Sequence, residues 1–264
     1  RGSGQDQDRR DVVTRVSDLS GRPAISVDHP GYAMEVYESF VQYLVRQPHR
    51  PKQLVFSINL RSFSPEWDLA PGWQFERWKL RNRWGDLAAL TAMQPLFTFR
   101  VLRLSPLTQD EYLKSPVFQG ECPVGTVRDF TGPAFDTFTE ENLRKKFIVL
   151  YQYPLTAEHR KLKAMMRIVD LCGKNGMKPY FYVTASDLET GGRILGPEFR
   201  KQVAANVKAI GDLLASRGGA FADFSGLLPA ADFCWREEKY PTEHLNERGR
   251  TKLCAEIARF IGGK

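Results

Sequence analysis

Short apolar runs alternate with stretches of helical periodicity along much of the chain, and this alternation constrains the fold more than any other feature. The apolar runs lie at 24–27, 54–60, 147–151, 177–184 and 220–224. The amphipathic stretches lie at 8–19, 32–46, 157–173, 198–217 and 246–261. Strands that alternate with helices form a mostly parallel sheet with helices packed on it. We therefore predict a single α/β domain that spans residues 1–264.

Residues 61–146 interrupt this alternation. They contain many prolines, few long periodic runs and four of the five tryptophans, namely Trp67, Trp73, Trp78 and Trp84. We predict that this segment is an insertion, partly helical, that lies over one edge of the sheet. The flat faces of the tryptophans suit stacking on sugar rings, and they suit equally the packing of the insertion onto the core.

Composition and motifs argue against several functional classes. No apolar run is long enough to span a bilayer, so we expect no membrane-spanning helix. No signal peptide is visible in these residues, and the sequence leaves the localisation open. The net charge of +7 is spread along the chain. It suits a solubilising surface that attracts anionic substrates, and no DNA- or RNA-binding motif accompanies it, so we expect no nucleic-acid partner. Neither C-x-x-C spacing nor a phosphate-binding glycine motif is present, so we expect no metal and no cofactor. The sequence leaves the oligomeric state open.

Loops at the carboxyl ends of parallel strands form the active sites of such sheets. In this chain those loops are 28–31, 59–64, 184–192 and 225–244. Residues 26–32 read SVDHPGY, residues 56–62 read FSINLRS, and residues 242–250 read TEHLNERGR. These three blocks resemble blocks of the SGNH (GDSL-like) esterase and acyltransferase family, and the resemblance covers about 8–60 and 147–261.

The resemblance implies a three-layer α/β/α fold of flavodoxin-like type and a serine-dependent reaction on a carbohydrate or other small ester. It implies that His244 is the catalytic base, and that the backbone N–H of Gly31 and the side-chain amide of Asn59 stabilise the oxyanion. These residue types suit acyl transfer, which needs a base in hydrogen-bond reach of a nucleophile and donors aimed at the developing charge.

We also assign three neighbouring residues, His29, Arg61 and Glu243, to substrate binding. Each site residue has a plainer interpretation. His244 would simply be an exposed residue next to a helix N-terminus, Asn59 and the Pro-Gly pair at Gly31 would be turn residues, and Arg61 would form a structural salt bridge.

Two features depart from the family pattern. The family's glycine–aspartate–serine block is not found in these residues, so either it lies upstream of residue 1 or the chain lacks it; Ser3 is the one early serine in a glycine-rich turn. Pro241 stands where the family has the aspartate that orients the base. The side chains that we consider in its place are Asp232, Glu237 and Glu238. An inactive SGNH-fold protein that binds a glycan or a protein partner therefore remains the alternative.

Overall fold

The computed structural model describes residues 6–27, 32, 34–64, 138–238 and 242–262. Its α-helices in this part of the chain are α1 (Val12–Ser20), α2 (Met34–Leu44), α8 (Glu140–Tyr151), α9 (Arg160–Lys174), α10 (Leu188–Leu195), α11 (Pro197–Ala215), α12 (Trp235–Glu238) and α13 (Glu247–Gly262). Two 3₁₀ turns, η1 (Leu60–Phe63) and η4 (Ala230–Asp232), accompany them. The tryptophans of the predicted insertion lie outside the described residues.

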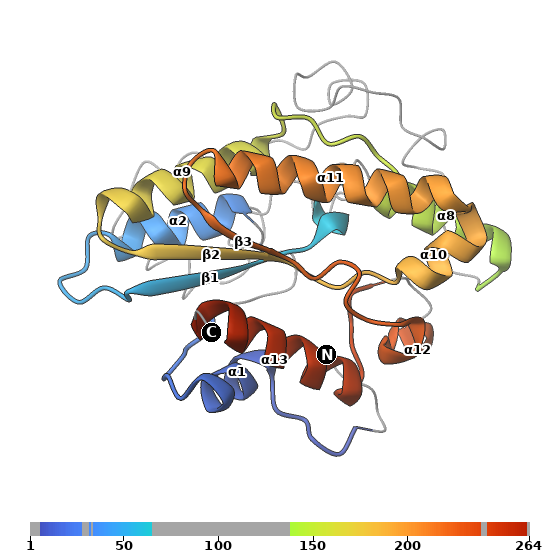
Figure 1. The fold of residues 1–264 in the computed structure, drawn as a ribbon, viewed down its shortest axis with the longest axis horizontal. Coiled ribbons are helices and arrows are strands. Elements are labelled where there is room, and N and C mark those ends of the chain that lie inside the picture. Colours follow the sequence, from blue (N-terminus) through green and yellow to red (C-terminus); the bar gives the residue numbers. More distant parts are fainter. Residues whose placement is uncertain (1–5, 28–31, 33, 65–137, 239–241, 263–264) are drawn as a thin grey trace, which may run out of the picture.

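A parallel sheet forms the centre of the described structure. Its strands are β1 (Gln53–Ile58), β2 (Lys178–Val183) and β3 (Ala220–Asp223), in the order β1-β2-β3. Figure 1 shows α2, α9 and α11 on one face of this sheet, and α1 and α13 on the other. The chain is thus a mixed α/β structure with a small parallel sheet, in agreement with the predicted class.

Apolar packing explains why β2 is the central strand. Its residues from Pro179 to Val183 are all buried, as expected where helices cover both faces of a parallel strand. The rings of Phe56 and Phe181 stack across β1 and β2 with centroids 4.9 Å apart. Burial of a side chain of this size contributes about 1.5–3 kcal/mol.

Most predicted elements are confirmed with shifted ends. The predicted strands at 54–60, 177–184 and 220–224 correspond to β1, β2 and β3, and the five predicted helices correspond to α1, α2, α9, α11 and α13. The ends differ because local capping sets them. For example, Asp11 caps α1 by accepting a hydrogen bond from the N–H of Thr14, so this helix begins at Val12 and not at the predicted residue 8.

The strand predicted at 147–151 is wrong, because these residues form the last turns of α8. Thr139 caps this helix by accepting a hydrogen bond from the N–H of Asn142 at 3.2 Å. Phe147 and Tyr151, one helical turn apart, are both buried. The apolar run is therefore one face of a helix, and a short run alone does not separate the two structures.

The strand predicted at 24–27 is also wrong. These residues form no strand, and the side chains of Ile25 and Val27 are 93% and 52% exposed. Within the described residues no strand lies beside them to complete a hydrogen-bonded ladder. A strand needs such a partner, whatever its propensity.

Candidate functional site

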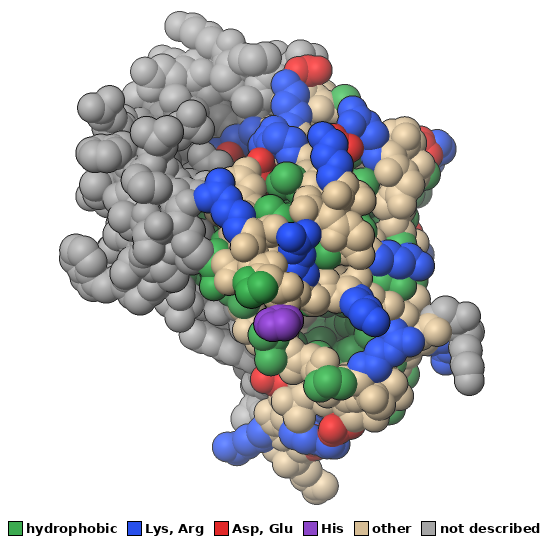
Figure 2. Space-filling model, turned by 90° about the vertical axis from the view of Figure 1, so that its left-hand side faces the viewer, with side chains coloured by type: hydrophobic (Ala, Val, Ile, Leu, Met, Phe, Trp, Pro, Cys, Tyr) green, Lys and Arg blue, Asp and Glu red, His purple; other side chains and the backbone are tan. Residues whose placement is uncertain are grey.

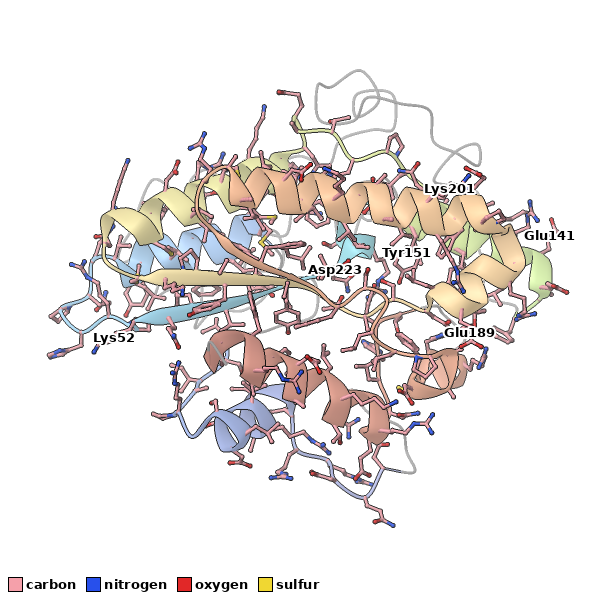
Figure 3. All side chains as sticks on the ribbon, in the orientation of Figure 1. Lys52, Glu141, Tyr151, Glu189, Lys201 and Asp223 are labelled. Carbon is pink, nitrogen blue, oxygen red and sulfur yellow. The ribbon has the colours of Figure 1, made fainter. Side chains whose placement is uncertain are left out.

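The carboxyl ends of the three strands meet at one edge of the sheet. Ile58, Val183 and Asp223 occupy equivalent positions at these ends. The next residue of β2, Thr184, donates its backbone N–H to the carbonyl of Ile58 at 2.9 Å, which continues the alignment past the strands. Figure 3 shows Asp223 and Tyr151 near this edge and Lys52 at the opposite end of the sheet.

Glu243 is the centre of a buried polar cluster at this edge. Its Oε2 accepts a hydrogen bond from Nδ2 of Asn59 at 2.6 Å and pairs with Nη2 of Arg61 at 3.2 Å. Its Oε1 accepts a hydrogen bond from the hydroxyl of Tyr151 at 2.8 Å. The side chains of Glu243 and Arg61 are only 6% and 12% exposed. Three segments far apart in the sequence thus converge on one carboxylate.

The backbone around Asn59 is held firmly in place. Asn59 has an extended backbone and precedes η1, and its carbonyl accepts hydrogen bonds from both the N–H and the hydroxyl of Ser62, at 3.0 and 2.7 Å. The ammonium group of the buried Lys161 donates in turn to the carbonyl of Ser62. The start of α9 therefore fixes the turn that carries Asn59.

The contact with Glu243 sets the orientation of the Asn59 amide. A flipped amide would place Oδ1 against a carboxylate oxygen, and two acceptors repel each other. One N–H of Nδ2 is used by Glu243, and the other makes no hydrogen bond within the described residues. Oδ1 is buried and also has no hydrogen-bond partner there. The amide therefore offers a donor in a fixed direction.

His244 lies directly after Glu243 and is half-buried. An antiparallel bridge joins Phe233 to Leu245, and the N–H of Cys234 donates to the carbonyl of His244 at 2.9 Å. The N–H of His244 donates to the hydroxyl of Thr242 at 3.2 Å. The backbone on both sides of the imidazole is therefore fixed by hydrogen bonds.

Asp232, one of the acids considered as a partner of His244, is engaged elsewhere. Its side chain is fully buried, and it pairs through Oδ1 with Arg248 and through Oδ2 with Lys252, the latter at 2.8 Å. Both cations belong to α13, so this carboxylate ties the loop before His244 to the last helix. The side chains of Glu237 and Glu238 lie outside the described residues.

The loop predicted at 184–192 contains a helix, α10, that sequence inspection missed. Asp187 caps it by accepting the N–H of Thr190 at 2.9 Å, and it also accepts the indole N–H of Trp235 at 3.0 Å. Trp235 is fully buried. Asp187 thereby joins the end of β2 to the segment that leads to His244.

The structure thus brings together Asn59, Arg61 and Glu243, and His244 is the residue that follows Glu243 in the chain. His29 and Gly31 lie outside the described residues, as do Ser3 and Pro241. Arg61 and Glu243 bind each other inside the protein. Their assignment to substrate binding therefore stays a prediction. Sequence inspection missed Tyr151, because its segment was predicted as a strand; the helical spacing of Phe147, Leu150 and Tyr151 was the signal that would have found it.

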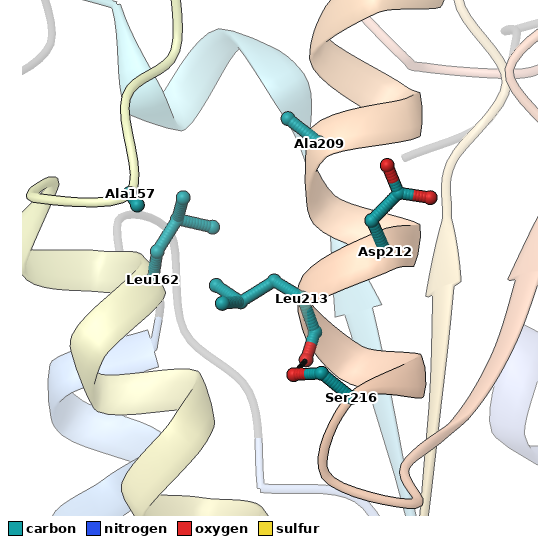
Figure 4. Close-up of a pocket in the computed structure, with 6 residues that line it drawn as sticks. All are labelled: Ala157, Leu162, Ala209, Asp212, Leu213 and Ser216. Atoms are coloured by element: carbon teal, nitrogen blue, oxygen red, sulfur yellow. Dashed lines mark hydrogen bonds between the residues drawn. The ribbon is translucent and has the colours of Figure 1, made fainter.

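A groove elsewhere on the molecule contains none of these residues. It measures about 310 Å³ and lies between α9 and α11 (Figure 4). Its lining is mostly apolar, and its one acid, Asp212, pairs with Lys208 at 2.5 Å. Its one hydroxyl, that of Ser216, donates to the carbonyl of Leu213 at 2.7 Å. The polar side chains at the carboxyl edge of the sheet converge on one buried carboxylate instead, so that edge is the better candidate site.

A scan against protein-family models, a search of curated proteins and a search of solved structures each give no match to this chain. Among the described residues no helix combines the length and apolar character needed to cross a bilayer. In the same part of the chain no group of three or more His, Cys, Asp or Glu side chains is arranged to hold a metal ion.

Proposed function

We propose that the carboxyl edge of the sheet is an SGNH-type active site in a three-layer α/β/α domain, and that it hydrolyses or transfers the acyl group of a carbohydrate or other small ester. The observation that carries this proposal is the 2.6 Å hydrogen bond between Asn59 and Glu243. It joins the block that ends β1 to the block that contains His244, although 184 residues separate them. Two motifs proposed for one reaction therefore lie side by side.

His244 acts as the general base in this proposal. Its imidazole accepts the proton of a serine hydroxyl while the serine oxygen attacks the ester carbonyl, and it returns that proton to the leaving alcohol. Water or an acceptor hydroxyl then attacks the acyl-serine in the reverse sequence. The serine is either the one of the family's missing block or Ser3, both of which lie outside the described residues.

Asn59 and Gly31 donate hydrogen bonds to the oxyanion that forms on the carbonyl oxygen. The N–H of Asn59 that Glu243 leaves unused serves this purpose. Each such donor contributes about 2.7–4 kcal/mol to transition-state stabilisation. The negative charge of Glu243 would repel an oxyanion close to it. The guanidinium of Arg61, whose Nη2 lies 3.2 Å from Oε2 of Glu243, compensates that negative charge.

The test compares turnover of p-nitrophenyl acetate by two alanine variants of the full-length protein. His244→Ala should lower kcat by about 10²–10⁴-fold, the usual contribution of a general base. His49→Ala is the matched control, because His49 is exposed and lies four residues before the amino end of β1. The proposal fails if both variants retain the turnover of the parent protein.

A non-catalytic binding role is the second candidate. Pro241 in place of the family's aspartate favours it, and so does the commitment of Arg61 and Glu243 to each other inside the protein. In that case the wild-type protein shows no esterase activity, and glycan or protein binding survives His244→Ala unchanged.

A further inference from the structure

The amino ends of the strands form a strongly basic surface at the end of the molecule opposite the candidate site. Its members are exposed cations from four different segments, namely Arg22, Arg50, Lys52, Lys174 and Lys178. We call these five residues the basic face. Figure 2 looks onto this end and shows Lys and Arg side chains gathered around a hollow with hydrophobic side chains in it.

Hydrogen bonds hold the segments of the basic face together. Lys178 donates its backbone N–H to the carbonyl of Lys52 at 2.9 Å. Nη1 of Arg50 reaches Oδ1 of Asn175, next to Lys174, at 3.0 Å. Arg22 likewise reaches the side chain of Gln53 at 2.8 Å. The cations are therefore parts of one surface.

Nearby acids do not neutralise this surface. Asp18 pairs with Arg10 and Asp170 pairs with Arg217, at 2.7 and 2.9 Å. Glu256 pairs with Arg259. Within the described residues no ion pair involves any member of the basic face, so its positive charge is available to a partner.

Exposed aliphatic side chains accompany these charges. Leu19 and Ile25 each lie three residues from Arg22 in the sequence, and they are 58% and 93% exposed. Leu19 and Arg22 also line a groove of about 500 Å³ between the C-terminal ends of α1 and α13, together with the alanines and Arg259 of α13. Aliphatic and cationic side chains thus share this end of the molecule.

We propose that this end of the protein binds peripherally to an anionic phospholipid surface. Cations near such a surface attract its headgroups, and aliphatic side chains bury themselves at the boundary between headgroups and acyl chains. A single-stranded nucleic acid would instead be expected to stack on aromatic side chains, whereas the large hydrophobic side chains exposed beside these cations are aliphatic. Docking in this way directs the candidate site at the carboxyl edge away from the lipid.

The test measures co-sedimentation with vesicles of phosphatidylcholine alone and of phosphatidylcholine mixed with phosphatidylglycerol. Wild-type protein should bind only the anionic vesicles, and high salt should weaken binding. Each basic side chain near an anionic membrane contributes about fivefold, so Lys52→Glu with Lys178→Glu should weaken binding by at least about 25-fold. Ile25→Ser should weaken it by roughly tenfold without any change of charge.

Lys201→Glu with Lys208→Glu is the matched control, because it changes the net charge equally on α11, and Figure 3 shows Lys201 far from Lys52. This control should bind like the wild type. Equal binding to both kinds of vesicle overturns the proposal, as does an equal loss in the control pair. Tighter binding to a DNA duplex than to anionic vesicles, insensitive to Ile25→Ser, would identify a nucleic-acid surface and overturn it as well.

Discussion

Removal of the Glu243 carboxylate should destabilise the protein far more than removal of an exposed one. Glu243→Ala removes the carboxylate that pairs with the guanidinium of Arg61, which is 12% exposed, and removes the acceptor that Glu243 offers to the N–H of Asn59 and to the hydroxyl of Tyr151. Breaking a buried ion pair from one side costs about 3–5 kcal/mol, because the remaining charge stays buried. In a domain of this size a loss of about 4 kcal/mol lowers Tm by roughly 8–16 °C.

Glu243→Gln separates the loss of charge from the loss of shape. The glutamine oxygen still accepts from Asn59 and Arg61, and its amide donates to the hydroxyl of Tyr151, which can rotate to accept. The buried charge of Arg61 loses its ion pair in this variant too, so most of the loss should remain, and Glu243→Gln should be more stable than Glu243→Ala by about 1–2 kcal/mol because its hydrogen bonds are kept. Urea denaturation of both variants measures the difference.

Glu141→Ala is the matched control. Glu141 is 74% exposed and pairs with Lys145 one turn along α8 at 2.7 Å, so its removal should hardly change the free energy of unfolding. In addition, Arg61→Ala should cost less in the Glu243→Ala background than alone, with a coupling of about 1–3 kcal/mol. Two results together would refute the buried cluster. Glu243→Ala would lower the free energy of unfolding no more than Glu141→Ala does, and the losses from Arg61→Ala and Glu243→Ala would simply add in the double variant.

Other sites give three further expectations. Burial raises the pKa of the Cys254 thiol from 9.0 to about 11, so stability should fall as pH rises above 9.0, and iodoacetamide should label this thiol only after unfolding. Hydrogen bonds from Arg10 hold the pKa of Asp8 well below 3.8, so its contribution is present above that pH and is lost on acidification; Asp8→Asn should flatten the urea midpoint against pH in the acid range. Gly249→Ala would place a Cβ 2.5 Å from the carbonyl oxygen of Asp232, and it should cost about 1–3 kcal/mol in urea unfolding.

The sequence was most informative where periodicity and length agreed. The run at 177–184 is short, almost wholly apolar and preceded by a long amphipathic stretch, which together predict a central parallel strand, and β2 is that strand. The run at 147–151 is also short and apolar, but it belongs to α8. The helix that contains this run begins after its capping residue, Thr139, which lies several residues before the apolar run. The apolar pattern alone therefore does not reveal the helix.

The candidate site was predictable only in part. A motif that follows a strand lies at the carboxyl edge of a parallel sheet, so the position of Asn59 and Arg61 at that edge was predictable, and their roles there stay a prediction. The partner of a buried polar group is set by tertiary packing, and Tyr151 reaches Glu243 from a helix that carries no recognisable motif. Similarly, nothing in the sequence showed that Asp232 would turn toward Arg248 and Lys252.

Labelling of the full-length protein with a fluorophosphonate probe, followed by mass spectrometry of the labelled peptide, tests the proposed acyl-transfer site most directly. We expect one serine to be labelled covalently, and we expect labelling to be about 10²-fold slower or more in His244→Ala, because the base no longer activates the hydroxyl. His49→Ala should be labelled at the wild-type rate. Absence of any labelled serine, or equal rates in the wild type and in His244→Ala, would contradict the proposed role of His244.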